Sequence, residues 1–258
     1  MKKIKLLIAS LVLLFTLNTT AHSQVLISLL LGDKLNSGKI EFGLDGGVNF
    51  LSMSNTPGGK SLFDWNLGFY FDFKLKPQNL FVHTGVLVKS KMGIGDLAPY
   101  PLSNDTLNDA FIGGYVDRKI NYFNVPILLR YQFYKYFFVE GGTQLGLRYT
   151  AFDFFNNNLP EKDDLIYKNV TKNNYTRLDA GGEIGLGYKL KKGTGMTIHA
   201  DYYFGFVDVN KTLAGQQKNS SWYINLSIPI GKAKAEKAAK EKAAKAADAT
   251  QKEPAVKQ

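Results

Sequence analysis

The sequence predicts an all-β protein, an eight-stranded antiparallel up-and-down β-barrel that spans a membrane. Three observations lead to this prediction: apolar and polar residues alternate over long segments, these segments are long enough to cross a bilayer, and long and short connections alternate between them. The composition agrees, because 18 Phe, 14 Tyr, 2 Trp and 25 Gly favour strands over helices. The 258 residues suffice for one large β domain.

The first 23 residues have the pattern of a secretory signal peptide. Three lysines lie in the first five residues, an apolar run extends from Ile4 to Leu17, and small residues precede Gln24. The apolar run is short for a membrane-spanning helix. We therefore expect export and a mature chain that begins at Gln24. Because the sequence has no cysteine, we expect neither a disulfide nor a lipid anchor on the mature chain.

Period-two alternation defines the predicted strands. It is clearest in the second one, where Trp65, Leu67, Phe69, Phe71 and Phe73 alternate with polar or small residues. The same pattern gives eight strands, at residues 39–50, 62–75, 79–91, 116–133, 136–152, 175–190, 195–208 and 221–230. Most exceed the usual strand of about five or six residues and reach the nine to eleven that cross a bilayer at a tilt. Their length indicates a membrane protein.

The connections between these strands alternate in length. Residues 51–61, 92–115, 153–174 and 209–220 form long polar loops, whereas the turns after Leu75, at 134–135 and after Leu190 are short. Outer-membrane barrels have long extracellular loops at one end and short periplasmic turns at the other. The long loops are therefore expected at the cell surface.

The volume of the side chains indicates which face of the sheet points inward. The lumen of an eight-stranded barrel is just wide enough to be filled by side chains. The apolar face carries four or more bulky residues on nearly every strand, which is more than such a lumen can hold. We therefore expect the apolar face to contact lipid. A soluble barrel with an apolar interior is the alternative that this argument disfavours.

The opposite face carries glycines and charged residues, and buried charges need partners. We expect an ion-paired structural network in the lumen, and a path for protons or ions is the alternative. The predicted network consists of Glu41, Asp45, Asp72, Arg130, Glu140, Arg148, Arg177, Asp179, Glu183 and Asp201, with Asp64, Lys74, Lys89 and Lys189 on the same face.

Four segments, in order and spacing, resemble the outer-membrane β-barrel domain family described as PorT-like or "porin family". They are YFNVPILLRYQF, FFVEGGTQLGLRY, RLDAGGEIGLGYKL and IHADYYFGFVDV, and the first contains the family's aromatic-x-x-(Val or Ile)-Pro pattern around Pro126. The resemblance covers about residues 39–230 and implies an eight-stranded outer-membrane barrel. A named member of the family is associated with protein secretion. The chain departs from a common family pattern because it continues past IPIG into a long tail.

Pro126 lies in the middle of a predicted strand, where proline removes a hydrogen bond from the ladder. Its parity places it toward the lumen. A bulge or strand offset can leave such a position unpaired and help a sheet to bend. We therefore predict a local break in the ladder at Pro126.

The sequence offers few candidates for chemistry. His83 and His199 have lumen-facing parity near the short-turn end, and we expect both to be hydrogen-bonded structural residues rather than catalytic ones. No pair of carboxylates, metal-spaced cluster or phosphate-binding loop stands out. We predict no catalytic residue, no metal site, no cofactor and no enzymatic activity.

The segments on either side of the barrel have their own composition. Residues 24–38 are largely apolar, and we expect an interfacial or barrel-capping helix, with a lumen plug or a protein contact as alternatives. Residues 231–258 form a Lys/Ala-rich periplasmic tail, predicted to be helical or disordered. Its lysines are a candidate contact for cell-wall polymer or other envelope proteins. Most of the net charge of +10 lies in the two ends, so nucleic-acid binding has no support.

The functional prediction is an outer-membrane protein of a Gram-negative bacterium with a structural or interaction role in the envelope, linked to secretion or assembly. Its partners would be outer-membrane lipid and envelope proteins, and we expect a monomer with loops 92–115 and 153–174 as its contact surface. A small-solute transporter is the alternative, and a lipid-modifying enzyme is a weaker one.

Overall fold

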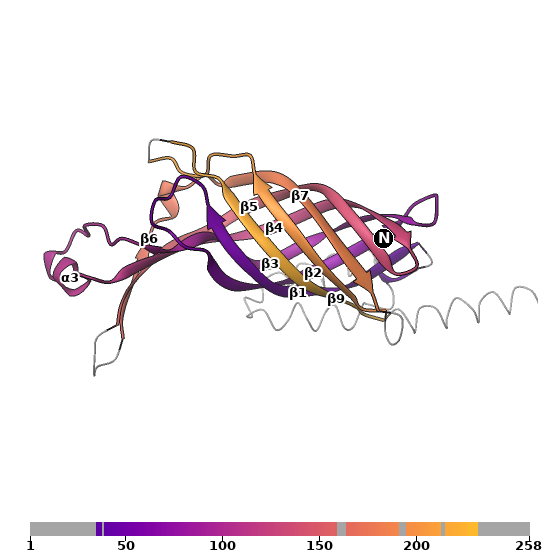
Figure 1. Ribbon diagram of the computed structural model, residues 1–258, viewed down its shortest axis with the longest axis horizontal. Coiled ribbons are helices and arrows are strands. Elements are labelled where there is room, and N and C mark those ends of the chain that lie inside the picture. The colour runs from indigo at the N-terminus through magenta and orange to yellow at the C-terminus, as the bar shows by residue number, and fades with distance from the viewer. Residues whose placement is uncertain (1–34, 38, 159–163, 191–194, 213–214, 232–258) are drawn as a thin grey trace, which may run out of the picture.

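A computed structural model describes residues 35–37, 39–158, 164–190, 195–212 and 215–231. The predicted signal peptide, nearly all of the apolar segment 24–38 and the tail lie outside these residues. The described elements, labelled in Figure 1, are the strands β1 (Ile40–Met53), β2 (Leu62–Lys74), β3 (Leu80–Leu97), β4 (Tyr115–Tyr134), β5 (Phe137–Asn157), β6 (Leu165–Val170), β7 (Leu178–Lys189), β8 (Thr197–Gly205) and β9 (Asn219–Pro229), the helix α3 (Asp105–Ala110) and the 3₁₀ turn η1 (Lys172–Asn174).

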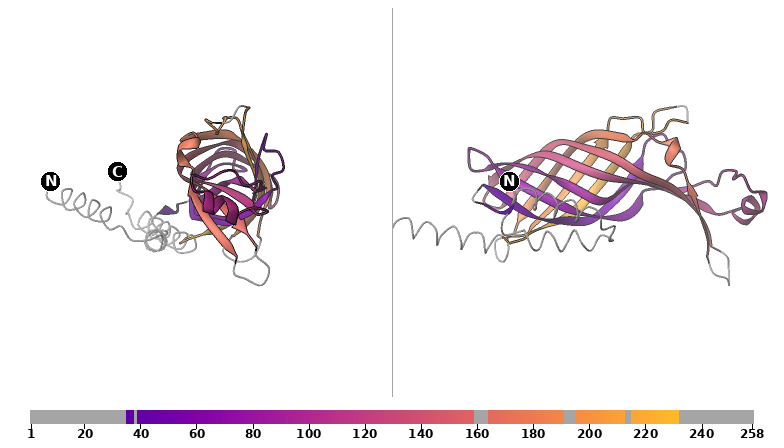
Figure 2. Two further views of the ribbon diagram at one scale, coloured as in Figure 1. Left: turned by 90° about the vertical axis from the view of Figure 1, so that its left-hand side faces the viewer. Right: turned by 180° about the vertical axis from the view of Figure 1, so that it is seen from behind.

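Eight of these strands close into an antiparallel barrel, as predicted. The ring runs β1-β2-β3-β4-β5-β7-β8-β9 and returns to β1 through the β1–β9 ladder. Figure 2 shows the closed ring along its axis and from behind. The eight strands coincide with the predicted ones to within a few residues, except that β3 and β5 extend further toward the long-loop end.

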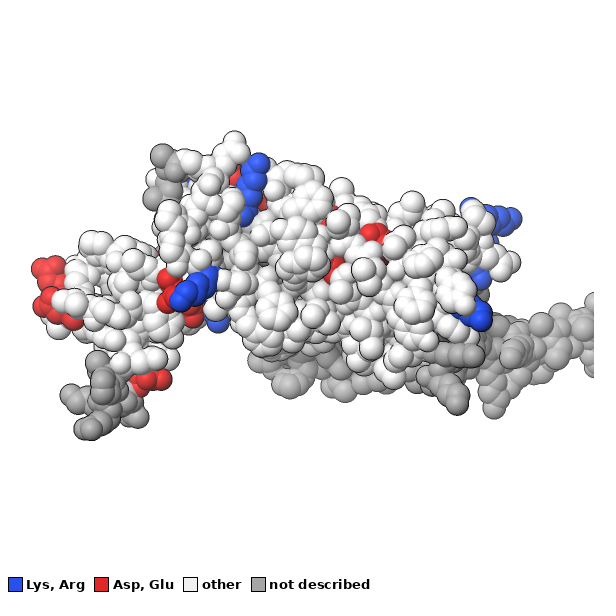
Figure 3. Space-filling view, in the orientation of Figure 1, with Lys and Arg blue, Asp and Glu red and all other residues white. Residues whose placement is uncertain are grey.

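The outward face of the barrel is apolar. Trp65, Leu129, Ile184 and Trp222 are between 44% and 57% exposed, although they lie in the middle of regular strands. Figure 3 shows few charged atoms over the middle of the barrel, whereas lysine and arginine side chains lie toward its ends. An apolar band bounded by polar ends suits a bilayer.

The predicted break at Pro126 is present on one side of β4. In the β3–β4 ladder, Thr84 pairs with Ile127 and Leu87 pairs with Asn124, and no pair joins them between these positions. On the other side, Pro126 remains paired with Gln144 of β5. The Thr84 hydroxyl donates a 2.7 Å hydrogen bond to the Pro126 carbonyl. A side chain thus connects the strands where proline provides no amide donor.

The predicted loops 92–115 and 153–174 are partly regular structure. β3 and β5 continue into them, α3 lies in the first loop, and β6 pairs with the end of β5 in the second. The two segments are long connections, as expected, and they contain regular structure that the sequence did not indicate. Together, residues 98–114, 153–158 and 164–170 form what we call the distal arm, which projects beyond the barrel in Figure 1. Among the described residues, no helix is long and apolar enough to span a membrane.

Candidate functional site

A network of buried ionisable side chains fills the lumen near the short-turn end. Arg130 is its centre: Nε donates to Glu140 Oε2 at 3.0 Å, and Nη1 donates to Asp72 Oδ2 at 2.9 Å. Asp72 Oδ1 also contacts His83 Nδ1 at 2.6 Å. Strand register creates these contacts, since Arg130 lies opposite Glu140 across β4–β5 and Asp72 lies opposite His83 across β2–β3. We call this group, with Asp45, His199 and Asp201, the lumen charge network.

His199 extends the network to β8, which also carries Asp201, and to β1, which carries Asp45. Its Nδ1 lies 2.5 Å from Asp201 Oδ2, and its Nε2 lies 3.1 Å from Asp45 Oδ1. Asp45 also accepts hydrogen bonds from the Ser227 hydroxyl at 2.8 Å and from the Asn225 amide at 3.2 Å. Both lumen histidines are therefore buried and hydrogen-bonded.

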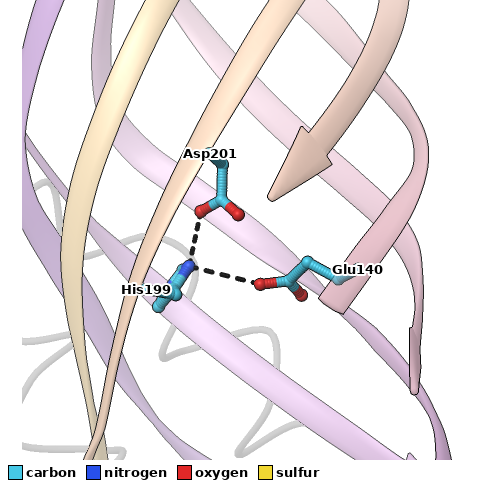
Figure 4. A group of neighbouring side chains, drawn as sticks. All are labelled: Glu140, His199 and Asp201. Carbon is cyan, nitrogen blue, oxygen red and sulfur yellow. Dashed lines mark hydrogen bonds and ion pairs between the residues drawn. The ribbon is translucent and has the colours of Figure 1, made fainter. Parts of the chain in front are cut away.

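Three members of the lumen charge network could share a metal ion. One ligand atom from each of Glu140, His199 and Asp201 lies within 4.8 Å of the others, and all three side chains are buried. Figure 4 shows the two carboxylates facing the same imidazole nitrogen, with Glu140 Oε1 at 3.5 Å from it. The sequence did not indicate this group because Glu140 is far from His199 in the chain, on a strand that is not adjacent to β8.

A second level of the lumen consists of tyrosines and amides. Tyr122, Tyr203 and Tyr223 are each at most 1% exposed. The amide of Asn219 donates to Asp179 Oδ2 at 2.7 Å, and the amide of Asn124 donates to the Ser90 hydroxyl at 2.9 Å. The sequence pattern did not single out these tyrosines.

Toward the long-loop end the lumen becomes apolar. Met92, Val116, Ile120, Ala151 and Phe155 belong to one buried cluster. The three levels together place buried side chains at successive positions along β4, from Arg130 through Tyr122 to Val116. Side-chain filling of this kind is what a narrow eight-stranded barrel allows.

The base of the distal arm contains a second buried ion pair. Arg118 and Asp153 form two hydrogen bonds, at 3.0 Å from Nε and 2.8 Å from Nη2. The Tyr100 hydroxyl donates to Asp153 Oδ2 at 3.0 Å and accepts from the Asn169 amide at 3.0 Å. Burial, together with the charge of Asp153, raises the pKa of Tyr100 to about 12. Tyr100 therefore stays protonated at neutral pH and continues to donate to Asp153.

The remaining predicted network residues occupy different places. Glu41 lies at the short-turn rim, where Oε1 accepts from the Tyr70 hydroxyl and Oε2 lies 3.3 Å from Lys189 Nζ. Asp179 and Glu183 are buried in the lumen.

The predicted lumen positions are wrong for Arg177 and Lys89. Arg177 is exposed beside the start of β7. Lys89 is also exposed and lies over the Trp65 ring, because a bulge between Leu87 and Ser90 reverses the parity of β3.

Arg148 does not join the carboxylates either. It is half-buried at a register shift in the β4–β5 ladder, and it donates to the backbone carbonyls of Thr176 and Tyr175. An inserted residue at this point turns the following part of β5 by one position. The same shift directs Asp153 inward to Arg118, a contact that the sequence did not predict.

The distal arm has an apolar pocket of about 320 Å³. Pro99, Leu102, Leu107, Phe111 and Phe155 line it with neighbouring residues of the same two segments. Ile112, at the rim, is 75% exposed.

Fold and lumen together define a transmembrane β-barrel with a filled interior. Residues 28–211 match the family described as "Outer membrane protein beta-barrel domain", and the chain belongs to that family. It is accordingly an outer-membrane protein whose outward face contacts lipid. The finer resemblance to PorT-like proteins stays a prediction.

Solved structures of low sequence identity also align with the chain. They include the attachment invasion locus protein Ail of Yersinia pestis (12% identity, 74% of this chain, 99% of Ail, TM-score 0.37) and Neisserial surface protein A (10% identity, 74% and 97%, TM-score 0.37). The outer membrane protein AlkL, solved in lipid bilayers, is 16% identical over 75% of this chain and 88% of its own, with a TM-score of 0.35. No curated protein sequence matches the chain.

Proposed function

We propose that the protein has a structural or interaction role in the outer membrane, in which the barrel anchors the distal arm and the arm contacts another envelope or surface component. The proposal rests on a difference between the barrel and the arm. Its lumen holds buried side chains at successive levels, whereas an apolar pocket and an exposed Ile112 lie on the arm beyond the barrel.

The arm is built to keep its shape. Tyr100 packs edge to face on Phe155 at 4.9 Å between ring centroids, and Phe111 packs on the same ring at 5.6 Å. Asn157 donates to the Ala110 carbonyl at 2.8 Å, which joins the end of β5 to α3. A preformed surface loses less conformational entropy on binding than a mobile loop does. These contacts support a recognition role for the arm.

The charge on the arm suits a partner with basic groups. Asp105 and Asp109 lie on α3, and Figure 3 shows acidic side chains at the tip of the projection. An apolar pocket beside carboxylates would favour a protein segment that combines apolar and basic side chains. Secretion or envelope assembly is the process in which we place such a contact, and we propose no enzymatic activity.

Photo-crosslinking in intact envelopes tests the role of the arm. A photoreactive residue at Ile112 should give a discrete adduct of higher mass, whereas the same residue at exposed Gln78, in a short turn, should not. A second variant, Leu107→Glu, changes the pocket lining and should remove the adduct at Ile112. Equal adducts from both positions, or an adduct that survives Leu107→Glu, would contradict a specific contact through the arm.

Small-solute transport requires a continuous aqueous path through or beside the barrel. The buried tyrosines Tyr122, Tyr203 and Tyr223 occupy the lumen and belong to the same buried cluster as Met92 and Phe155. We therefore prefer the interaction role, and conductance measurements separate the two functions.

A further inference from the structure

We propose that the barrel lumen binds one divalent transition-metal ion, of the kind represented by Zn²⁺, through His199 Nδ1 and the carboxylates of Glu140 and Asp201. Figure 4 shows the three side chains facing one another. Imidazole nitrogen combined with carboxylate oxygen suits Zn²⁺ and its neighbours better than Mg²⁺ or Ca²⁺, which prefer oxygen ligands alone. This site goes beyond the proposed interaction role and does not depend on it.

The spacing of the candidate ligands fits a single ion. His199 Nδ1 and Glu140 Oε1 are 3.5 Å apart. Two ligands of a tetrahedral ion with bonds of about 2.0–2.2 Å are separated by roughly 3.3–3.6 Å. Asp201 lies closer, at 2.5 Å, in hydrogen-bonding contact with the same nitrogen. A rotation of the Asp201 carboxylate would exchange that contact for a bond to the ion.

The surroundings of His199 orient the ring as a ligand. Its other nitrogen, Nε2, lies 3.1 Å from Asp45 Oδ1, and Asp45 is held by Ser227 and Asn225. A proton on Nε2, donated to Asp45, leaves the Nδ1 lone pair directed at Glu140 and Asp201. Metal-binding histidines usually donate their second N–H to a carboxylate in this way.

Two buried carboxylate oxygens next to the group lack a hydrogen-bond partner. They are Asp201 Oδ1 and Glu183 Oε2, in side chains that are 1% and 5% exposed. Glu183 lies on β7, two residues from Gly185, between the strands that carry Glu140 and Asp201. Unpaired buried carboxylate oxygens are costly. A cation at this position would give the Asp201 carboxylate a partner.

The backbone leaves room for the group. Gly185 is paired with Glu140 on one side and with Asp201 on the other, so the three residues lie in one row across β5, β7 and β8. A Cβ atom at Gly185 would lie 1.7 Å from Asp201 Oδ1. The absence of a side chain at Gly185 therefore allows the unpaired oxygen to lie between the two outer strands.

The local charge also favours a cation. Five buried carboxylates, those of Asp45, Asp72, Glu140, Glu183 and Asp201, face Arg130 and two histidines. The acidic side chains outnumber the basic ones in this group, which suits a divalent cation. The ion would also link β5 to β8, two strands that are not adjacent in the ring.

Metal content of the folded protein tests the proposal. The mature chain would be purified without a histidine tag, stripped with a chelator, incubated with Zn²⁺ and dialysed, and its zinc measured by mass spectrometry. We expect about one ion per folded barrel, and X-ray absorption should show nitrogen and oxygen ligands. A folded wild-type barrel that retains no zinc above the dialysis background would overturn the site.

Variants locate the ion. His199→Gln and Asp201→Asn should lose the bound zinc, whereas His83→Gln, which changes the other lumen histidine, should keep it. Asp45→Asn should weaken zinc binding about 10–100-fold, because it removes the group that orients His199. Gel migration of unboiled samples shows which variants are folded. Where ligand variants do not fold, the absorption spectrum of the wild-type protein decides, and a spectrum without an imidazole contribution refutes the assignment.

Discussion

Replacing Arg130 by methionine should strongly destabilise the barrel. Arg130 is 4% exposed, and its guanidinium contacts both Glu140 and Asp72. Methionine fills a similar volume but leaves two buried carboxylates without their shared cation. Removing one partner of a buried ion pair typically costs about 3–5 kcal/mol. We expect the free energy of unfolding to fall by about that amount.

Urea unfolding of the barrel in lipid vesicles would measure this change. Trp65 and Trp222, the two tryptophans of the chain, lie on the outward face and report transfer from lipid to water by fluorescence. Arg177→Met is the matched control, since exposed Arg177 lies outside the network, and it should change stability by less than about 0.5 kcal/mol.

A double variant sharpens the test. Arg130→Met combined with Glu140→Met removes a charge from each side of the pair, and it should be more stable than the sum of the single effects predicts. The lumen charges would not depend on one another if Arg130→Met alone lowered the free energy of unfolding by less than about 1 kcal/mol and no more than the Arg177 control does. That result would refute this view.

Other predictions concern single positions. Gly142→Ala should reduce the folded fraction, because the new Cβ would lie 2.1 Å from a backbone carbonyl oxygen of β4. In the control Gly141→Ala, the nearest atom lies 3.7 Å from the new Cβ, and the variant should fold normally. Gel migration of unboiled samples measures the folded fraction of each. Thr84→Val removes the hydrogen bond to the Pro126 carbonyl and should cost about 0.5–1.5 kcal/mol in urea unfolding. Because the pKa of Tyr100 is raised to about 12, its contribution to stability is complete below about pH 10 and is lost as the pH rises toward 12. Absorbance titration at 295 nm, compared with Tyr100→Phe, would detect this ionisation, and ionisation near pH 10 would contradict the described contacts.

The barrel itself could be predicted because its signal is local. Period-two alternation sets the face of each residue within a strand, and no knowledge of strand neighbours is needed. Pro126 could likewise be interpreted from the chemistry of one residue. The inward direction of Asp45, Asp72 and Asp201 follows from parity alone.

The pairs within the lumen could not be predicted, because they depend on register. The β4–β5 turn lies at 135–136, one residue later than expected, and a shift between Gln132 and Tyr134 then brings Glu140 opposite Arg130. Without that shift, Gly141 would lie there. A change of one residue decides whether Arg130 has its partner.

Bulges account for the errors of direction at Lys89 and Asp153, whereas Arg177 is exposed just before β7 begins at Leu178. The irregularity after Leu87 turns Lys89 outward onto Trp65, and the one beside Arg148 directs Asp153 toward Arg118. Alternation counted along one strand cannot reveal an inserted residue, because the insertion is defined by the partner strand. The same effect concealed the extension of β5 and its pairing with β6.

Single-channel recording in planar bilayers tests the central claim most directly. A barrel whose lumen is filled by the charge network, the buried tyrosines and the apolar cluster should give no stable conductance steps, with a water-filled porin in the same bilayer as the positive control. Steady, solute-dependent conductance by the folded wild-type protein would contradict the account and would favour transport.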